Sequence, residues 1–181
     1  MIDESLAEDV NAIAALNGSF LLRSGQTAST YFDKYRFEAD PTLLKRVANE
    51  MIPLLPAEAD ILAGLELGGV PIATALPLAT GRPAAFVRKE AKNYGTCLAV
   101  EGSDVAGKRV VLIEDIITTG GAVADAVRLV EAAGAKVIGV VCAIWRGDGE
   151  PRIAALPMLP VAAAMTMGDL VPERSAIGRG R

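Results

Sequence analysis

The spacing of apolar residues changes part-way along the chain, near residue 60. Before that point, apolar residues three or four positions apart predict an amphipathic helix over residues 2–16. Asp40 followed by Pro41 predicts the start of a second helix, which we expect to end at about residue 55. Two short extended segments, 20–23 and 31–36, lie between these helices on either side of a turn, so they predict a small flap rather than core strands.

From residue 61 onward, short apolar segments rich in β-branched residues alternate with helical segments. The predicted strands are 61–65, 84–88, 110–113, 137–144 and 161–165, and the predicted helices are 72–78 and 122–133. This alternation is typical of an α/β domain with a central, mostly parallel sheet flanked by helices. Ligands of such sheets bind beyond the carboxyl ends of the strands. The loops that follow Leu65, Arg88, Ile113 and Ile144 are therefore the candidate site.

Composition narrows the possible chemistry. The 181 residues suit one domain, and 51% of them are hydrophobic, which is enough for a full core. A net charge of −4 without a broad basic segment argues against general binding to nucleic acid or to a membrane surface, although a local cationic cluster is enough for a small anion. The chain contains no His, so imidazole catalysis and His-ligated metal sites are excluded for this chain acting alone.

The cysteines and the apolar windows indicate neither a metal site nor a membrane span. Cys97 and Cys142 match no zinc or redox spacing. The apolar window at 137–145 is too short to cross a bilayer, and prolines interrupt the window at 153–167. The amino terminus lacks a basic start followed by an apolar stretch, so no signal peptide is predicted. We expect a soluble, cytoplasmic protein.

The segment around the predicted strand 110–113 carries the strongest chemical signal. Glu114 and Asp115 follow the four apolar residues of this strand, and their burial would be costly unless they face a ligand or solvent. Two threonines and two glycines at 118–121 then form a turn that leads directly into a helix, whose free amides and positive dipole end form an anion site. Carboxylates for sugar hydroxyls beside amides for a phosphate fit a sugar phosphate.

Two common nucleotide-binding motifs fit this segment poorly. No Lys follows the glycines, as a Walker loop requires, and the glycines are adjacent rather than spaced as in a dinucleotide-binding fold. The plain alternative is an ordinary strand, turn and helix with solvated acids and a Thr that caps the helix.

The segment resembles the phosphoribosyl-diphosphate-binding motif of type I phosphoribosyltransferases. In that family the acidic pair holds the ribose hydroxyls and the Thr-rich loop wraps the 5-phosphate. The resemblance assigns contacts with the ribosyl diphosphate to Glu114, Asp115, Ile116, Ile117, Thr118, Thr119, Gly120, Gly121 and Ala122. It also implies Mg2+ carried by the ribosyl diphosphate, without a direct protein ligand, which fits a site that offers oxygen atoms.

A basic cluster follows the predicted strand 84–88. Arg88, Lys89 and Lys92 place three cations within five residues, and the weakly periodic segment 89–103 predicts a mobile lid that a diphosphate would order. A solvated surface loop is the alternative. The string Arg-Lys-Glu-Ala-Lys, followed by a short linker and Gly, resembles the catalytic loop of orotate phosphoribosyltransferases, which reaches the diphosphate partly across a dimer interface.

This second resemblance implies catalytic roles for Lys89, Lys92 and Asp115, and diphosphate contacts for Arg88, Lys89, Lys92 and Tyr94. Tyr94 departs from the family pattern, because the best-known members have a His at its place. Proton donation by that His cannot operate here, although a phenol can still form a hydrogen bond to phosphate.

The turn after the strand 61–65 is a second departure from the family pattern. Many relatives have a Lys where this chain has Gly68. Backbone amides still bind phosphate, but one cation is lost. Weaker binding of the diphosphate and compensation by Lys34 are the two alternatives.

The flap and the loop after the strand 137–144 resemble the part of the family's site that binds the base. Tyr31 and Phe32 correspond to an aromatic pair against the base ring, and Arg23 to a cation that meets ligand anions. Arg146 corresponds to an Arg that pairs with the carboxylate of orotate, and Thr118 bonds the ring. Packing within the flap and a surface position for Arg146 are the alternatives.

The resemblance covers nearly the whole chain and implies one domain of the type I phosphoribosyltransferase fold, with a helix and flap over 1–40 and a core over 41–181. The implied reaction transfers a ribosyl phosphate from 5-phospho-α-D-ribose 1-diphosphate to orotate, in a homodimer. Transfer to another base, or a non-catalytic regulatory role for the same fold, are the open alternatives.

Overall fold

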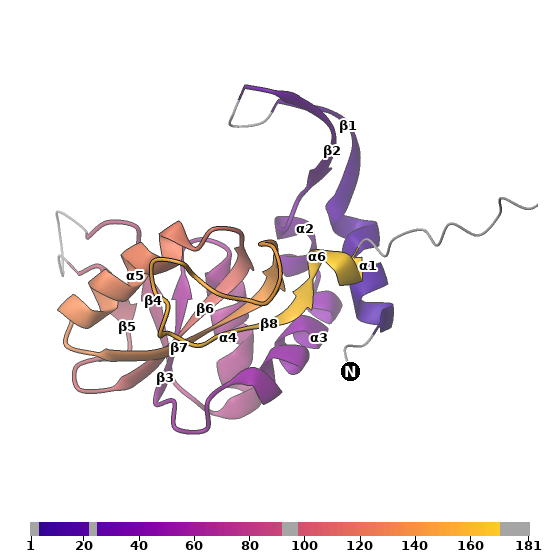
Figure 1. The fold of residues 1–181 in the computed structure, drawn as a ribbon. Helices are drawn as coiled ribbons and strands as arrows, with labels where there is room; N and C mark the ends of the chain where they lie inside the picture. Colours follow the sequence, from indigo (N-terminus) through magenta and orange to yellow (C-terminus); the bar gives the residue numbers. More distant parts are fainter. Residues whose placement is uncertain (1–3, 22–24, 92–97, 171–181) are drawn as a thin grey trace, which may run out of the picture.

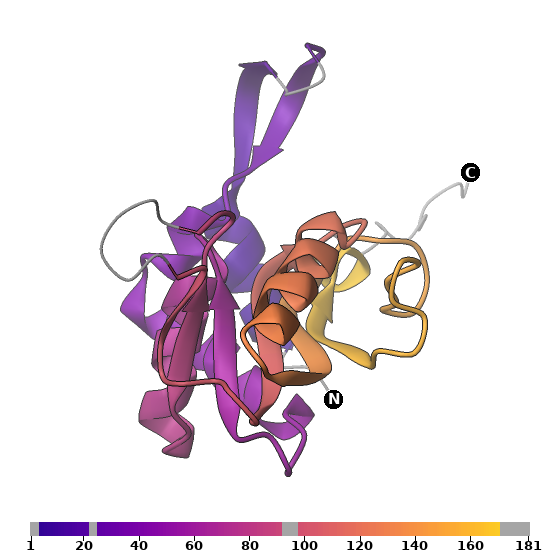
Figure 2. The ribbon, with the colours of Figure 1, turned by 90° about the vertical axis from the view of Figure 1, so that its left-hand side faces the viewer.

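The computed structural model describes residues 4–21, 25–91 and 98–170 (Figure 1). Its central strands are β3 (Ile61–Leu65), β4 (Ala84–Val87), β5 (Val100–Gly102), β6 (Arg109–Ile117), β7 (Lys136–Trp145) and β8 (Val161–Thr166). They form one sheet in the order β5-β4-β3-β6-β7-β8, and each neighbouring pair except β4 and β5 is parallel. A separate antiparallel ribbon of β1 (Ala15–Leu21) and β2 (Thr27–Phe32) projects away from this sheet (Figures 1 and 2).

Helices cover both faces of the central sheet. They are α1 (Glu4–Ala14), α2 (Tyr35–Glu38), α3 (Pro41–Met51), the 3-10 helix η1 (Ile52–Leu54), α4 (Gly69–Thr80), α5 (Gly121–Ala132) and α6 (Met167–Leu170). One core cluster joins α1, α3 and α4 to one face through side chains such as Leu6, Val47 and Leu76. A second cluster joins α5 to the other face through Val123 and Val130. The α/β architecture with a mostly parallel sheet is therefore confirmed.

The helix α3 begins where the sequence predicts it. The Asp40 carboxylate accepts hydrogen bonds from the backbone N–H groups of Thr42 and Leu43, both at 2.9 Å, and Pro41 occupies the first turn. These bonds satisfy amides that have no partner within the helix. The helix fixes the position of α2, which directly precedes it and carries residues of the candidate site.

The amino-terminal boundaries differ from the prediction. The first helix ends at Ala14, and β1 begins at once, where the helical spacing of apolar residues had been extended to residue 16. The ribbon is longer than the predicted flap and begins earlier in the chain, because the two strands pair from Ala15 opposite Phe32 onward. Pairing with a distant strand overrides a local helical pattern here.

Two strand boundaries in the core also differ. β6 does not end before Glu114 and Asp115 but runs on to Ile117, because it pairs with β7 as far as Trp145. The predicted lid over 89–103 is wrong at its far end, since β5 forms an antiparallel edge with β4. Residues 92–97 of that segment lie outside the described residues.

Two further observations concern membranes and cysteine. No helix in the described ranges is long and apolar enough to cross a membrane. Cys142 lies fully buried on β7 as a free thiol, and burial raises the pKa of this thiol to about 12. A structural thiol is therefore the interpretation that the fold supports.

Candidate active site

The carboxyl ends of β3, β4, β6 and β7 lie at one edge of the sheet because these strands are parallel. Backbone hydrogen bonds tie the chain at these ends together. The N–H of Glu66 donates to the carbonyl of Val87 at 2.9 Å, and the N–H of Arg146 donates to the carbonyl of Ile117 at 2.8 Å. The four loops that the sequence singled out therefore meet at one place.

The turn between β6 and α5 forms a small cradle. A cavity of about 140 Å³ is lined by Glu114, Ile116, Ile117, Thr118, Thr119, Gly120, Gly121, Ala122 and Val123. Gly120 has a left-handed φ of 79°, and a Cβ at this position would lie 2.6 Å from the Ile153 side chain. Because the cavity includes the first residues of a helix, its free amides and the positive dipole end suit an anion such as a phosphate.

Asp115 has surroundings that the sequence did not predict. Its side chain is fully buried, and Oδ2 lies 2.5 Å from Nζ of Lys34, while Oδ1 accepts a hydrogen bond from the N–H of Ile116 at 2.5 Å. The carboxylate also lies against the start of α4, because a Cβ on Gly68 would fall 1.6 Å from Oδ2. Of the two acids that the sequence predicts to face a ligand or solvent, Glu114 lines the cradle, whereas Asp115 lies buried against Lys34 and Gly68.

Two more carboxyl groups surround Asp115, and both are almost completely buried. Burial raises the pKa of Glu114 to about 10, and a hydrogen bond with Asp115 and its charge add to the effect. The same causes raise the pKa of Glu38 to about 9. Burial would also raise the pKa of Asp115, but hydrogen bonds with Glu114 and Lys34 outweigh burial and lower it. At neutral pH, protonated Glu38 and Glu114 therefore flank an ionised Asp115 that pairs with Lys34.

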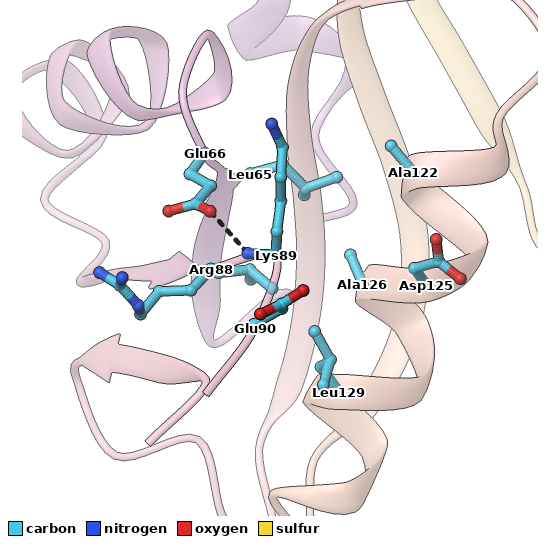
Figure 3. A pocket seen from close by; sticks show the side chains of 10 residues that line it. Leu65, Glu66, Arg88, Lys89, Glu90, Ala122, Asp125, Ala126 and Leu129 are labelled. Carbon is cyan, nitrogen blue, oxygen red and sulfur yellow. Dashed lines mark hydrogen bonds between the residues drawn. The ribbon is translucent and has the colours of Figure 1, made fainter. Parts of the chain in front are cut away.

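A larger cavity of about 390 Å³ lies beside the cradle and shares Ala122 with it (Figure 3). Its walls come from the ends of β3 and β4 and from the side of α5: Leu65, Glu66, Val87, Arg88, Lys89, Glu90, Ala122, Asp125, Ala126 and Leu129. The backbone N–H of Lys89 donates to Oε1 of Glu66 at 2.8 Å, and Lys89 itself is exposed. Figure 3 shows the Arg88 guanidinium pointing away from α5. Arg88 and Lys89 therefore contribute to the wall of this cavity, with the Arg88 guanidinium turned away from α5.

A third group of residues lies where the ribbon meets the loop after β7. The guanidinium carbon of Arg146 lies 6.0 Å from the ring centroid of Phe32, although the two residues are far apart in the sequence. The turn after Arg146 also packs on the cradle, since a Cβ on Gly147 would fall 3.0 Å from the carbonyl oxygen of Thr118. A cation and an aromatic ring thus stand beside the cradle, as an anionic planar ligand would require.

Comparison with known proteins identifies the family. The family model described as the phosphoribosyl transferase domain matches residues 39–158. An orotate phosphoribosyltransferase from a Nocardioides species is 58% identical over 97% of this chain and 98% of its own length. This chain belongs to the orotate phosphoribosyltransferases.

More distant members of the family agree with this assignment. The orotate phosphoribosyltransferase of Halobacterium salinarum is 40% identical over 85% of the chain and 87% of its own length. The crystal structure of the Mycobacterium tuberculosis orotate phosphoribosyltransferase with Fe(III) dicitrate is 33% identical, with a TM-score of 0.81 over 93% of this chain and 98% of its own. The structure of the same enzyme with 5-phospho-α-D-ribosyl 1-diphosphate is 30% identical, with a TM-score of 0.75 over 92% and 97%. The type I phosphoribosyltransferase fold is therefore confirmed.

The structure brings together most of the family-like residues that it describes. Arg88, Lys89, Arg146, Phe32 and the residues from Glu114 to Ala122 surround the strand ends. Tyr31 does not join Phe32: successive strand residues point to opposite faces, and the Tyr31 ring packs on Phe20 at 5.5 Å. Arg23, Lys92 and Tyr94 lie outside the described residues, so their roles stay predictions.

Sequence reasoning missed Glu38 and gave Lys34 only as a substitute for a cation absent at Gly68. A single Glu in a four-residue helix resembles a surface residue, and nothing local indicates that it lies near Asp115. The Lys34 ammonium does lie beside Gly68, since both contact Oδ2 of Asp115.

Proposed function

We infer that this chain catalyses the reaction of its family. It transfers a ribosyl phosphate from 5-phospho-α-D-ribose 1-diphosphate to orotate, which gives orotidine 5'-phosphate and diphosphate in pyrimidine biosynthesis. The observation that supports this most directly is the meeting of a helix-terminal anion cradle with the Arg146 and Phe32 pair at one sheet edge. An anionic, planar base and a sugar phosphate are the ligands that these two features suit.

The cradle binds the 5-phosphate of the ribosyl group. The amides at the start of α5 and the exposed hydroxyls of Thr118 and Thr119 donate hydrogen bonds to the phosphate oxygens. Glu114 lines the same cavity and accepts hydrogen bonds from the ribose hydroxyls. Asp115 also binds the ribose once the ligand has displaced part of what now surrounds the Asp115 carboxylate, including Lys34. The remaining residues of the turn, from Ile116 to Ala122, shape this cavity.

The larger cavity and the basic loop bind the diphosphate. Arg88 and Lys89 stand at the cavity wall, and the loop brings Lys92 and Tyr94 to the leaving group, with Lys89, Lys92 and Asp115 as catalytic residues. Many relatives have a Lys at the position of Gly68. Lys34 replaces that missing cation here, because the Lys34 ammonium lies beside the turn that contains Gly68.

Mg2+ carried by the ribosyl diphosphate would neutralise charge on the leaving group. Such an ion would be held mainly through the oxygen atoms of the substrate, which is the ligand type that Mg2+ prefers. We further propose a cytoplasmic homodimer in which the loop of one subunit serves the site of the other, as the family resemblance implies.

Orotate binds between the ribbon and the loop after β7. Arg146 presents a planar pair of donors to its carboxylate, Phe32 lies against its ring, and Thr118 forms a hydrogen bond to the ring. Stacking by Tyr31 has less support, since its ring packs on Phe20 instead. Arg23 remains a proposed contact for ligand anions.

The chemistry needs little proton transfer. The ring N–H nitrogen of orotate forms a bond to the anomeric carbon, the bond from that carbon to the diphosphate oxygen breaks with its electron pair, and the leaving diphosphate takes up the proton that the nitrogen loses. Positive charge develops on the sugar in the transition state, and the ionised carboxylate of Asp115 beside the ribose stabilises it. A chain without His is sufficient for such a displacement.

The test is a direct assay of the whole chain. Incubation with Mg2+, orotate and the ribosyl diphosphate should consume orotate, followed by its absorbance, with one diphosphate released for each orotate. Lys92→Ala and Asp115→Asn should lower turnover severely while the fold is retained. Near-normal turnover in both variants would defeat these roles, and turnover with uracil or a purine in place of orotate would assign another base.

A further inference from the structure

Trp145 is the last residue of β7 and directly precedes Arg146. Its side chain is only 3% exposed and belongs to the core cluster that joins α5 to the sheet. The one polar group of the indole reaches out of this core. Its N–H donates a hydrogen bond to the carbonyl of Gly149 at 3.0 Å, and Gly149 is an exposed residue.

This hydrogen bond closes the turn that begins with Arg146. It joins the end of β7 to a residue four positions later, and Gly149 adopts a left-handed φ of 65° in that turn. At the start of the turn, the backbone N–H of Arg146 donates to the carbonyl of Ile117 at 2.8 Å. The backbone from which the Arg146 side chain leaves the sheet is therefore held at its own N–H and again three residues later.

Gly147 fills the inside of the same turn. A Cβ on Gly147 would lie 2.4 Å from Cζ2 and 2.8 Å from Cε2 of the Trp145 ring, and 3.0 Å from the carbonyl oxygen of Thr118. The turn therefore packs on the indole and on the cradle at once, with no space for one more carbon atom. Because the indole is buried in the core, it offers this turn a rigid support.

The Arg146 side chain needs such a support. It is exposed, and its guanidinium carbon lies 6.0 Å from the ring centroid of Phe32. A long exposed side chain samples many rotamers, so the direction of its backbone decides where the guanidinium can reach. Bidentate pairing with a carboxylate demands a defined geometry, and a displacement of about 1 Å is enough to weaken such a contact.

We propose that Trp145 is a positioning residue of the orotate site, whose indole holds the turn 146–149 on the cradle and so directs Arg146 toward the carboxylate of the base. The inference rests on the proposed role of Arg146 in binding orotate. Its consequence is selective. Loss of the indole contact weakens the use of orotate and leaves the ribosyl diphosphate nearly unaffected, because the cradle itself is built by the turn between β6 and α5.

Two replacements test the contact from its two sides. Trp145→Phe keeps an aromatic ring in the core and removes the N–H donor, whereas Gly147→Ala keeps the indole and pushes the turn away from it. Each should raise the KM for orotate about three- to tenfold, the range that one hydrogen bond supports, and leave the KM for the ribosyl diphosphate within about twofold. Gly139→Ala is the matched control on the same strand, since its Cβ would meet only ordinary contacts at 3.6 Å and 3.7 Å, and it should change neither value.

A double replacement shows whether the effect passes through Arg146. Arg146→Ala alone should raise the KM for orotate at least about tenfold. Addition of Trp145→Phe to this variant should change the KM by less than about twofold, because the guanidinium that the indole positions is already absent. Thermal unfolding establishes that each variant is folded, and if Trp145→Phe does not fold, Gly147→Ala in the Arg146→Ala background decides.

Three outcomes contradict the inference. A wild-type KM for orotate in both single variants, or equal rises in the KM values for the two substrates, would mean that Trp145 only fills the core. Additive effects of Trp145→Phe and Arg146→Ala would mean that the indole does not act through Arg146. If the wild-type chain itself does not turn over orotate, the proposed function fails, and this inference fails with it.

Discussion

Gly68→Ala should disrupt the ribose site through one methyl group. A Cβ at this position would lie 1.6 Å from Oδ2 and 2.3 Å from Cγ of Asp115, whereas ordinary contacts begin near 3.4 Å. The carboxylate must therefore move by more than an ångström, away from the Lys34 ammonium that it now contacts at 2.5 Å. The backbone of Gly68 has a φ of −68°, which alanine also adopts. The expected effect of Gly68→Ala therefore comes from the clash and not from backbone strain.

The magnitude follows from the ion pair. Separating a buried carboxylate from its partner costs about 3 to 5 kcal/mol. Because Lys34 is 31% exposed and keeps part of its hydration, we expect the lower end, about 3 kcal/mol. For a chain of this length, that corresponds to a fall in Tm of roughly 6 to 12 °C. We also expect at least a tenfold loss of affinity for the ribosyl diphosphate.

Urea denaturation and calorimetric titration measure the two effects. Gly168→Ala is the control, because its Cβ would meet Thr166 Oγ1 at an ordinary 3.5 Å. In a Lys34→Met background the cost of Gly68→Ala should shrink, since the ion pair is already absent. Equal unfolding free energies for Gly68→Ala, Gly168→Ala and the wild-type chain would refute the reasoning.

Three further predictions concern pH, the base and the cradle. Glu38 and Glu114 have folded pKa values of about 9 and 10, above the usual value of about 4.3, so the folded state binds more protons and stability should fall as pH rises from about 5 to 8. Glu38→Gln should make this slope shallower by up to about 1.4 kcal/mol per pH unit in urea denaturation, and an unchanged slope would contradict the protonated state. Arg146→Ala should weaken orotate binding by about 10- to 100-fold and leave the ribosyl diphosphate within about threefold, and equal losses in separate titrations would refute the assigned contact. Ile153→Ala should lower the free energy of unfolding by about 2 to 5 kcal/mol, because the buried Ile153 side chain supports Gly120, and a loss below about 1 kcal/mol would count against that support.

The parts of the fold that local patterns determine were predictable. The alternation of apolar strands and helices along the sequence predicted the mostly parallel sheet. Because parallel strands place their carboxyl ends at one edge, the loops that form the candidate site could be predicted as well. The Thr-Thr-Gly-Gly turn also predicted the start of a helix, and α5 begins at Gly121; anion binding by this helix start stays a prediction.

What depends on distant partners was not predictable. Two acids after four apolar residues look like the end of a strand, yet pairing with β7 carries β6 past them to Ile117. The pairing of Lys34 with Asp115 joins residues eighty-one positions apart, and the burial of Glu38 follows from the same approach. The aromatic pair at 31–32 divides between two faces once the ribbon's register is known.

The crystal structure of this chain with the ribosyl diphosphate and Mg2+ tests the central claim most directly. We predict the 5-phosphate within hydrogen-bond distance of the amides between Thr118 and Gly121, and the ribose hydroxyls on Glu114 and Asp115. A sugar phosphate bound away from this turn, with Asp115 still paired to Lys34 and Glu114 without contact to the ribose, would contradict it.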